Sequence, residues 1–103
     1  MRRKSPEGSP AGTPSEESLS LRIIFYAYIL KSESHGTYYY GSTDNIFERL
    51  KEHNAGRQRY TKGSRPWIIH YVEEFKTRSE ARQREVFFKS IDGYRYLKSN
   101  GII

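Results

Sequence analysis

The sequence predicts an α+β domain in which a three-stranded antiparallel sheet carries helices. Two short runs rich in aromatic and β-branched residues, 25–30 and 37–42, flank a polar segment that ends in Gly36, which is the pattern of a β-hairpin. A third run of this kind follows Pro66. The segments between and after these runs carry helix-capping residues and apolar positions at helical spacing, so they predict helices that pack on the sheet.

The hairpin determines where the aromatic side chains of its two strands lie. We expect the chain to turn within Ser32–Gly36, with the turn centred between Glu33 and Ser34. Facing residues then have numbers that sum to 67, so Tyr28 faces Tyr39 directly. A slip of one residue would move one of these rings to the opposite side of the sheet.

A first helix is predicted directly after the hairpin. Asp44 or Asn45 can cap its start, and Gly56 ends it after about residue 55. Arg49 and His53 are four residues apart and share one face of this helix. Another face is apolar and consists of Ile46, Phe47 and Leu50.

The second half of the chain predicts one strand and two helices. The strand runs through residues 67–72, and Thr77 followed by Glu80 is a capping box for a helix over about 78–90. Gly93 is expected to break the chain before a short helix over 94–99. The side chains expected to face the core are Ala81, Glu85, Phe88, Tyr94 and Leu97, and the carboxylate among them needs a partner.

Composition separates a tail from a basic domain. Residues 1–20 contain three of the four prolines and balanced charges, so we expect a disordered tail followed by one domain over 21–103. The net charge of +6 therefore lies in the domain, which suggests a polyanion such as DNA, although a solvated basic surface explains the charge equally well. The chain has no cysteine and no apolar run of about 20 residues, so we expect a soluble cytoplasmic protein.

Several motifs occur in an order that resembles one nuclease family. A tyrosine on the first strand is followed eleven positions later by a second tyrosine and then by a glycine; a helix with an arginine and a His-Asn pair comes next, and a glutamate lies on a later helix. The matching residues are Tyr28, Tyr39, Gly41, Arg49, His53, Asn54 and Glu85. The chain thus resembles the GIY-YIG nuclease superfamily over about 25–100, most of all its small standalone bacterial members related to the N-terminal nuclease domain of excinuclease C. Tyr26 replaces the glycine of the first motif, and Tyr40 replaces the isoleucine of the second.

The resemblance implies a metal-dependent endonuclease that hydrolyses DNA phosphodiester bonds and selects DNA structure in repair or recombination. Tyr28 or Tyr39 would activate the attacking water, with Tyr28 the stronger candidate, once a nearby cation such as Arg49 lowers or buffers the pKa of the phenol. Arg49 would hold phosphate oxygens, and His53 would relay a proton. Glu85 would be the sole protein ligand of Mg²⁺ or Mn²⁺.

Each of these residues also has an ordinary structural explanation. The two tyrosines could be a cross-strand aromatic pair, and His53 could interact with the dipole at the end of its helix. Arg49 could pair with a neighbouring glutamate, and Glu85 could pair with an arginine. The candidate ion-pair partners are Glu48 and Glu52 for the former, and Arg82, Arg84 and Arg49 for the latter.

The segment before the third strand is predicted to follow the DNA backbone. We call residues 57–65 the basic loop; its candidate DNA contacts are Arg57, Arg59, Tyr60, Lys62 and Arg65. No sequence-reading motif is apparent, so a protein partner could supply specificity. The competing hypothesis is a nucleic-acid-binding module that keeps the fold without turnover, and a purely structural interaction domain is a third. A late asparagine serves some family members, but we do not expect Asn100 to do so here.

Overall fold

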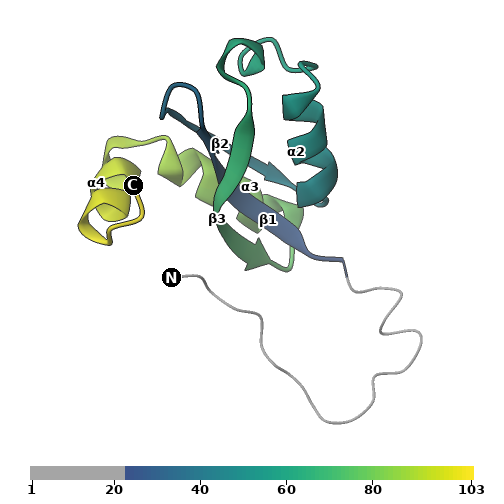
Figure 1. Ribbon diagram of the computed structural model, residues 1–103. Coiled ribbons are helices and arrows are strands. Elements are labelled where there is room, and N and C mark those ends of the chain that lie inside the picture. The colour runs from purple at the N-terminus through teal and green to yellow at the C-terminus, as the bar shows by residue number, and fades with distance from the viewer. Residues whose placement is uncertain (1–22) are drawn as a thin grey trace, which may run out of the picture.

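The computed structural model describes residues 23–103, so the predicted tail over 1–20 lies outside the described residues. These residues form a three-stranded antiparallel sheet in the order β2-β1-β3, with helices on both sides (Figure 1). The α+β prediction is therefore confirmed. The elements are β1 (Phe25–Ser32), β2 (Tyr38–Thr43), α2 (Ile46–Asn54), a 3₁₀ turn η1 (Lys62–Ser64), β3 (Trp67–Phe75), α3 (Arg78–Phe88) and α4 (Ile91–Ser99).

The hairpin register differs from the predicted one by two residues. Tyr28 pairs with Gly41 and Leu30 pairs with Tyr39, so the residue numbers sum to 69 and the predicted Tyr28 to Tyr39 pairing is wrong. The turn is longer than expected because Gly36, with φ of 72°, takes the left-handed conformation and closes the loop onto Ser32. A shift of two residues keeps each side chain on its predicted face, so Tyr28 and Tyr39 become diagonal neighbours on one side of the sheet.

Helix α2 begins and ends as predicted. The side chain of Asn45 accepts a hydrogen bond from the backbone N–H of Glu48, and Gly56 follows the helix with φ of 79°. Of the predicted apolar face, Ile46 is buried but Phe47 is 73% exposed, so this face packs against the protein only in part. The buried side of this short helix consists of Ile46 and His53, with Leu50 partly buried, and Phe47 lies outside it.

Strand β3 is longer than predicted and contains a bulge. Ile29 pairs with Tyr71 while Leu30 pairs with Ile69, so His70 is an extra residue on β3. The ring of His70 contacts the backbone oxygen of Ile102 through its Nε2 atom at 2.6 Å. The bulge thereby directs this side chain toward the C-terminal segment.

Helices α3 and α4 follow each other with almost no connection. Thr77 caps α3 as predicted, and Ser90 caps α4 by accepting from the N–H of Gly93. Gly93 lies inside the first turn of α4, so the predicted chain break there is wrong. A Cβ atom at Gly93 would lie 2.6 Å from the carbonyl carbon of Phe87, which means that the glycine permits close packing of α4 on the end of α3.

The sheet separates two small cores. Helices α3 and α4 cover one face, where Ala27, Ile29, Phe88 and Leu97 are buried, and α2 covers the other, where Tyr28, Leu30, Ile46 and Trp67 are buried. Tyr94, which we expected to face inward, is 53% exposed. Among residues 23–103, the helices are too short and too polar for any of them to span a bilayer.

Candidate active site

The site begins at a glycine that lies opposite a tyrosine. Tyr28 on β1 crosses over Gly41 on the edge strand β2, and a Cβ atom at Gly41 would lie 2.5 Å from Cζ of the tyrosine ring. Tyr28 is 1% exposed, and its ring centroid is 6.4 Å from that of Tyr39. The bare backbone at Gly41 therefore leaves room for the buried phenol of Tyr28 over the edge strand.

Helix α2 places His53 against both tyrosines. Its Nε2 atom is 3.3 Å from the hydroxyl oxygen of Tyr28, and its ring centroid is 4.7 Å from that of Tyr39. On the far side of the ring, Nδ1 is 2.9 Å from Oγ1 of Thr61 in the basic loop. His53 and Thr61 are both buried, so the imidazole is held between the sheet and the basic loop.

The surroundings shift the pKa values of Tyr28 and His53 in opposite directions. Burial raises the pKa of Tyr28 to about 12, the guanidinium of Arg49 opposes this shift, and the charge of Glu85 adds to it. Arg49 thus lowers the pKa of Tyr28 as expected, but desolvation outweighs the cation and the pKa is raised overall. Burial, together with the charge of Arg49, lowers the pKa of His53, so near neutral pH the phenol is protonated and the imidazole is uncharged.

Arg49 lies one helical turn before His53. Its Nη1 atom donates to Oε1 of Glu52 at 2.9 Å, which is one of the two partners considered from the sequence. Its Nε–H is buried and has no hydrogen-bond partner among the described residues. A buried donor without an acceptor is uncommon in proteins, and a guanidinium in this state is suited to receive an anionic oxygen.

Glu85 reaches the same edge of the sheet from the opposite face. Its Oε1 atom accepts from the hydroxyl of Ser42 at 2.7 Å, and its Oε2 atom accepts from the ammonium of Lys89 at 2.8 Å. Ser42 follows Gly41 on β2, so the carboxylate and the phenol of Tyr28 lie beside neighbouring residues of one strand. Burial alone would raise the pKa of Glu85, but the hydrogen bonds from Lys89 and Ser42 lower it, so the carboxylate is ionised at neutral pH.

This carboxylate is a reasonable ligand for a divalent ion. It is ionised, only 7% exposed, and already accommodates a cation in the form of Lys89. Mg²⁺ and Mn²⁺ prefer oxygen ligands, and Mg²⁺ needs only one or two carboxylates because it keeps several waters. Residues 23–103 contain no group of three or more His, Cys, Asp or Glu side chains arranged to hold a metal.

The basic loop lies beside the two tyrosines. Tyr60 is 85% exposed, and its ring centroid is 6.3 Å from that of Tyr39. Arg57, Arg59 and Lys62 are exposed as well. Arg65 is exposed but folds back, because its Nε donates to the carbonyl of Lys62 at 2.8 Å.

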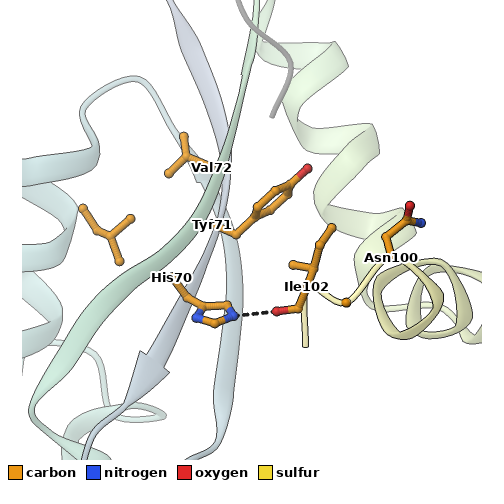
Figure 2. Close-up of a pocket in the computed structure, with 7 residues that line it drawn as sticks. His70, Tyr71, Val72, Asn100 and Ile102 are labelled. Atoms are coloured by element: carbon orange, nitrogen blue, oxygen red, sulfur yellow. Dashed lines mark hydrogen bonds between the residues drawn. The ribbon is translucent and has the colours of Figure 1, made fainter. Parts of the chain in front are cut away.

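Asn54 of the His-Asn pair and the late Asn100 both make structural hydrogen bonds. Asn54 exchanges two hydrogen bonds with the backbone of Trp67, at 2.7 and 3.0 Å, and so fastens the end of α2 to the start of β3. The amide of Asn100 donates to the carbonyl of Tyr96. Figure 2 shows Asn100 at a hollow beside β3 and the C-terminal segment, where His70 meets Ile102. Because β2 and β3 are opposite edges of the sheet, this hollow is separate from the Glu85 site.

Sequence reasoning missed three residues that contact the site. Lys89 lies four residues after Glu85, a helical spacing that could have revealed the pair. Of the partners considered from the sequence, Arg82 does lie 3.9 Å from Oε1 of Glu85, whereas Arg84 pairs with Glu73 instead. Ser42 follows the motif glycine, but its contact depends on the position of α3. Thr61 meets His53 only through the path of the basic loop, for which the sequence carries no local signal.

Known proteins are similar to the chain in sequence. The family model described as the GIY-YIG catalytic domain matches residues 24–93. A UPF0213 protein of Bacillus licheniformis is 43% identical over 67 residues, which cover 64% of this chain and 68% of that protein. A UPF0213 protein of Halobacterium salinarum is 39% identical over 69 residues, covering 66% of this chain and 88% of that protein.

A solved structure is also similar. The solution NMR structure of a UPF0213 protein from Bacillus halodurans is 30% identical, with a TM-score of 0.45, covering 75% of this chain and 84% of that one. The family model alone covers more than half of the chain. The chain therefore belongs to the GIY-YIG catalytic domain family and, with its relatives, to the UPF0213 proteins.

Proposed function

We propose that this protein is a metal-dependent endonuclease that hydrolyses DNA phosphodiester bonds and selects its substrate by DNA structure. The observation that carries the proposal is the meeting of four groups at one edge of the sheet. The Tyr28 phenol lies over Gly41 and contacts His53, the guanidinium of Arg49 acts on the same phenol and keeps a partnerless Nε–H, and the ionised Glu85 binds Ser42, the next residue on β2. We also infer kinship with the N-terminal nuclease domain of excinuclease C from the order of the motifs.

A proton path begins at the Tyr28 phenol. Since this phenol is protonated near neutral pH, it cannot remove a proton from water unless it gives up its own. His53 Nε2, 3.3 Å away and uncharged, is available to accept that proton. As water attacks phosphorus, its proton passes to the oxygen of Tyr28 and the phenolic proton passes to His53. The P–O bond to the leaving oxygen breaks with its electron pair and the leaving oxygen takes a proton from solvent, while His53 releases its extra proton to solvent, so that one phosphomonoester and one hydroxyl end result.

Arg49 and Glu85 would complete the chemistry. The guanidinium can donate to a nonbridging phosphate oxygen through its partnerless Nε–H, where charge increases as the reaction proceeds. Glu85 would hold Mg²⁺ or Mn²⁺. When bound, such an ion supplies charge neutralisation at the phosphate and at the leaving oxygen. Ser42 keeps the carboxylate at the edge of β2.

The basic loop would carry the DNA backbone to this edge. Arg57, Arg59 and Lys62 are exposed beside the site, and cations in such a position bind phosphates without reading sequence. The exposed ring of Tyr60 can pack against a sugar or base. We infer selectivity for DNA structure from this arrangement, with a protein partner as an additional source of specificity.

A binding module without turnover is the second candidate. Lys89 occupies one oxygen of the carboxylate that would hold the metal, and the pKa of Tyr28 is raised. Both features favour slow chemistry. DNA binding without cleavage would be the outcome of this alternative.

A cleavage assay separates the two candidates. The full chain is incubated with duplex, flap and branched DNA, in Mg²⁺, Mn²⁺ or chelator. We expect metal-dependent nicking that Tyr28→Phe, Arg49→Ala and Glu85→Gln each abolish, whereas Tyr94→Phe and Glu80→Gln, at exposed positions, retain it. Binding of DNA with no nicking on any substrate would refute the enzyme and support the binding module.

A further inference from the structure

Three buried polar side chains connect the sheet to the basic loop. Tyr28 is 1% exposed, His53 is fully buried and Thr61 is 1% exposed. Two contacts join them in a row: Tyr28 Oη to His53 Nε2 at 3.3 Å, and His53 Nδ1 to Thr61 Oγ1 at 2.9 Å. A third contact continues the row, since the hydroxyl of Thr61 donates to the carbonyl of Gln58 at 3.3 Å.

The direction of these hydrogen bonds follows from what each group can donate. The protonated phenol of Tyr28 must give its hydrogen to an acceptor, and the neighbouring Arg49 offers only donors. Among the described residues, the acceptor within reach is Nε2 of His53. A neutral imidazole with a bare Nε2 carries its hydrogen on Nδ1, which then donates to Thr61.

Thr61 can accept the hydrogen bond from His53 because its own hydroxyl hydrogen has another acceptor. The carbonyl oxygen of Gln58, 3.3 Å from its hydroxyl, offers an acceptor for that hydrogen, so the hydroxyl oxygen is available to accept from His53. The reverse order would have Thr61 donate to His53, and Nε2–H would then point at the phenol. Tyr28 would be left with a buried O–H and no acceptor among residues 23–103, which carries a large penalty.

The backbone around Thr61 is fixed on both sides. Its N–H donates to the carbonyl of Gln58 at 3.1 Å, and its own carbonyl accepts from the indole N–H of Trp67 at 2.9 Å. Trp67 is in turn tied to α2 through the amide of Asn54. The hydroxyl oxygen of Thr61 is therefore held in place opposite the ring of His53.

We propose that Thr61 is a positioning residue, which holds His53 in the tautomer protonated at Nδ1 so that Nε2 faces Tyr28 as a proton acceptor. The catalytic meaning of this role rests on the proposed function, whereas the tautomer itself does not. A chain of the same kind, in which an acceptor orients a histidine toward a hydroxyl, underlies other hydrolases. Thr61 thus extends the site from the sheet into the basic loop.

Nitrogen NMR of the full-length protein tests the tautomer directly. Two-bond ¹⁵N–¹H correlations report which ring nitrogen of His53 carries hydrogen, and the exposed His35 and His70 serve as references in the same spectrum. We expect the Nδ1–H form in the wild type and in Thr61→Ser, which keeps the hydroxyl. Thr61→Val, which replaces the hydroxyl by a methyl group of similar size, should shift His53 toward the Nε2–H form.

The same variants are then compared in cleavage. Thr61→Val should lower the cleavage rate by about tenfold, a part of the roughly 10²- to 10⁴-fold that a positioned base contributes, and Thr61→Ser should restore most of it. An Nε2–H tautomer in the wild type would overturn the proposal, even if Thr61→Val fails to fold. An unchanged tautomer in Thr61→Val would overturn it too. Absence of cleavage in the wild type, with the expected tautomers present, would refute the proposed function and leave the positioning of His53 intact.

Discussion

Replacing Gly41 by alanine adds one methyl group at the point where Tyr28 crosses β2. The new Cβ would lie 2.5 Å from Cζ and 3.0 Å from Cε2 of the tyrosine ring, with the hydroxyl oxygen of Tyr28 closer still. The backbone of Gly41 lies outside the left-handed region, so alanine can adopt it. The substitution therefore tests the position of the ring alone.

The expected effect on stability is smaller than the effect on activity. Carbon atoms in contact prefer about 3.5–4.0 Å, so the ring of Tyr28 must move by roughly 1 Å. Overpacking of this kind costs about 1–3 kcal/mol, and the entropy that alanine removes from the unfolded chain offsets about 0.4–1 kcal/mol. A shift of 1 Å breaks the 3.3 Å contact with His53 and can reduce the rate of a positioned reaction by about 100-fold.

Two measurements on Gly41→Ala separate these effects. Urea unfolding should show a loss of about 1–2 kcal/mol, from the values above, and nicking of branched DNA should fall about 100-fold. Gly63→Ala is the matched control, since a Cβ there meets nothing within 4 Å, and it should change neither. Wild-type nicking by a folded Gly41→Ala protein would refute the reasoning that the phenol must lie over a bare backbone.

Four further predictions concern single groups of the site. Arg49→Lys should reduce cleavage by about 10²- to 10³-fold, because an ammonium lacks the Nε–H donor, while its unfolding free energy changes by less than about 1 kcal/mol; wild-type activity would contradict the phosphate role. Glu85 has a lowered pKa, so its contribution to folding stability is present above the ordinary value of 4.5 and is lost as the pH falls below that value. In urea unfolding at several pH values, Glu85→Gln should therefore lose less stability than the wild type as the solution becomes acidic. An unchanged dependence on pH would contradict this. Tyr28 has a pKa raised to about 12 from 10.0, so its contribution to stability is complete below pH 10 and declines as the pH rises toward 12; the stability of Tyr28→Phe should fall less steeply over that range. Arg59→Ala should weaken DNA binding equally for all sequences and reduce the slope of log K against log salt by about one, as fluorescence anisotropy at several salt concentrations would show.

The local features of the fold could be predicted from the sequence because neighbouring residues produce them. Asn45 and Thr77 cap their helices through backbone groups three residues away, and Gly56 ends α2 through its own φ. Glu85 is buried as its helical spacing indicated. The errors occurred where distant parts of the chain meet. A glycine often indicates that a helix is interrupted, yet Gly93 lies within α4, where its lack of a side chain permits the close contact with α3.

The partners of the site residues could be predicted only in part. The candidate catalytic and metal-binding residues lie on β1, β2, α2 and α3. Which side chains contact each of them depends on the packing of α2 and α3 on opposite faces of the sheet. Lys89, not Arg84, binds Glu85, because Arg84 points toward Glu73 on β3. Thr61 had no signal at all, since its role depends on the path of a nine-residue loop.

The edge position of β2 places the candidate active site beside a strand whose outer backbone has no sheet partner among the described residues. Such an edge invites added strands and, with them, aggregation. Here, a fourth strand paired along Gly41 and Ser42 would cover the approach to both the phenol and the carboxylate. If the proposed function holds, an extended peptide that adds to β2 would therefore compete with DNA, and access to this edge would control the activity from outside.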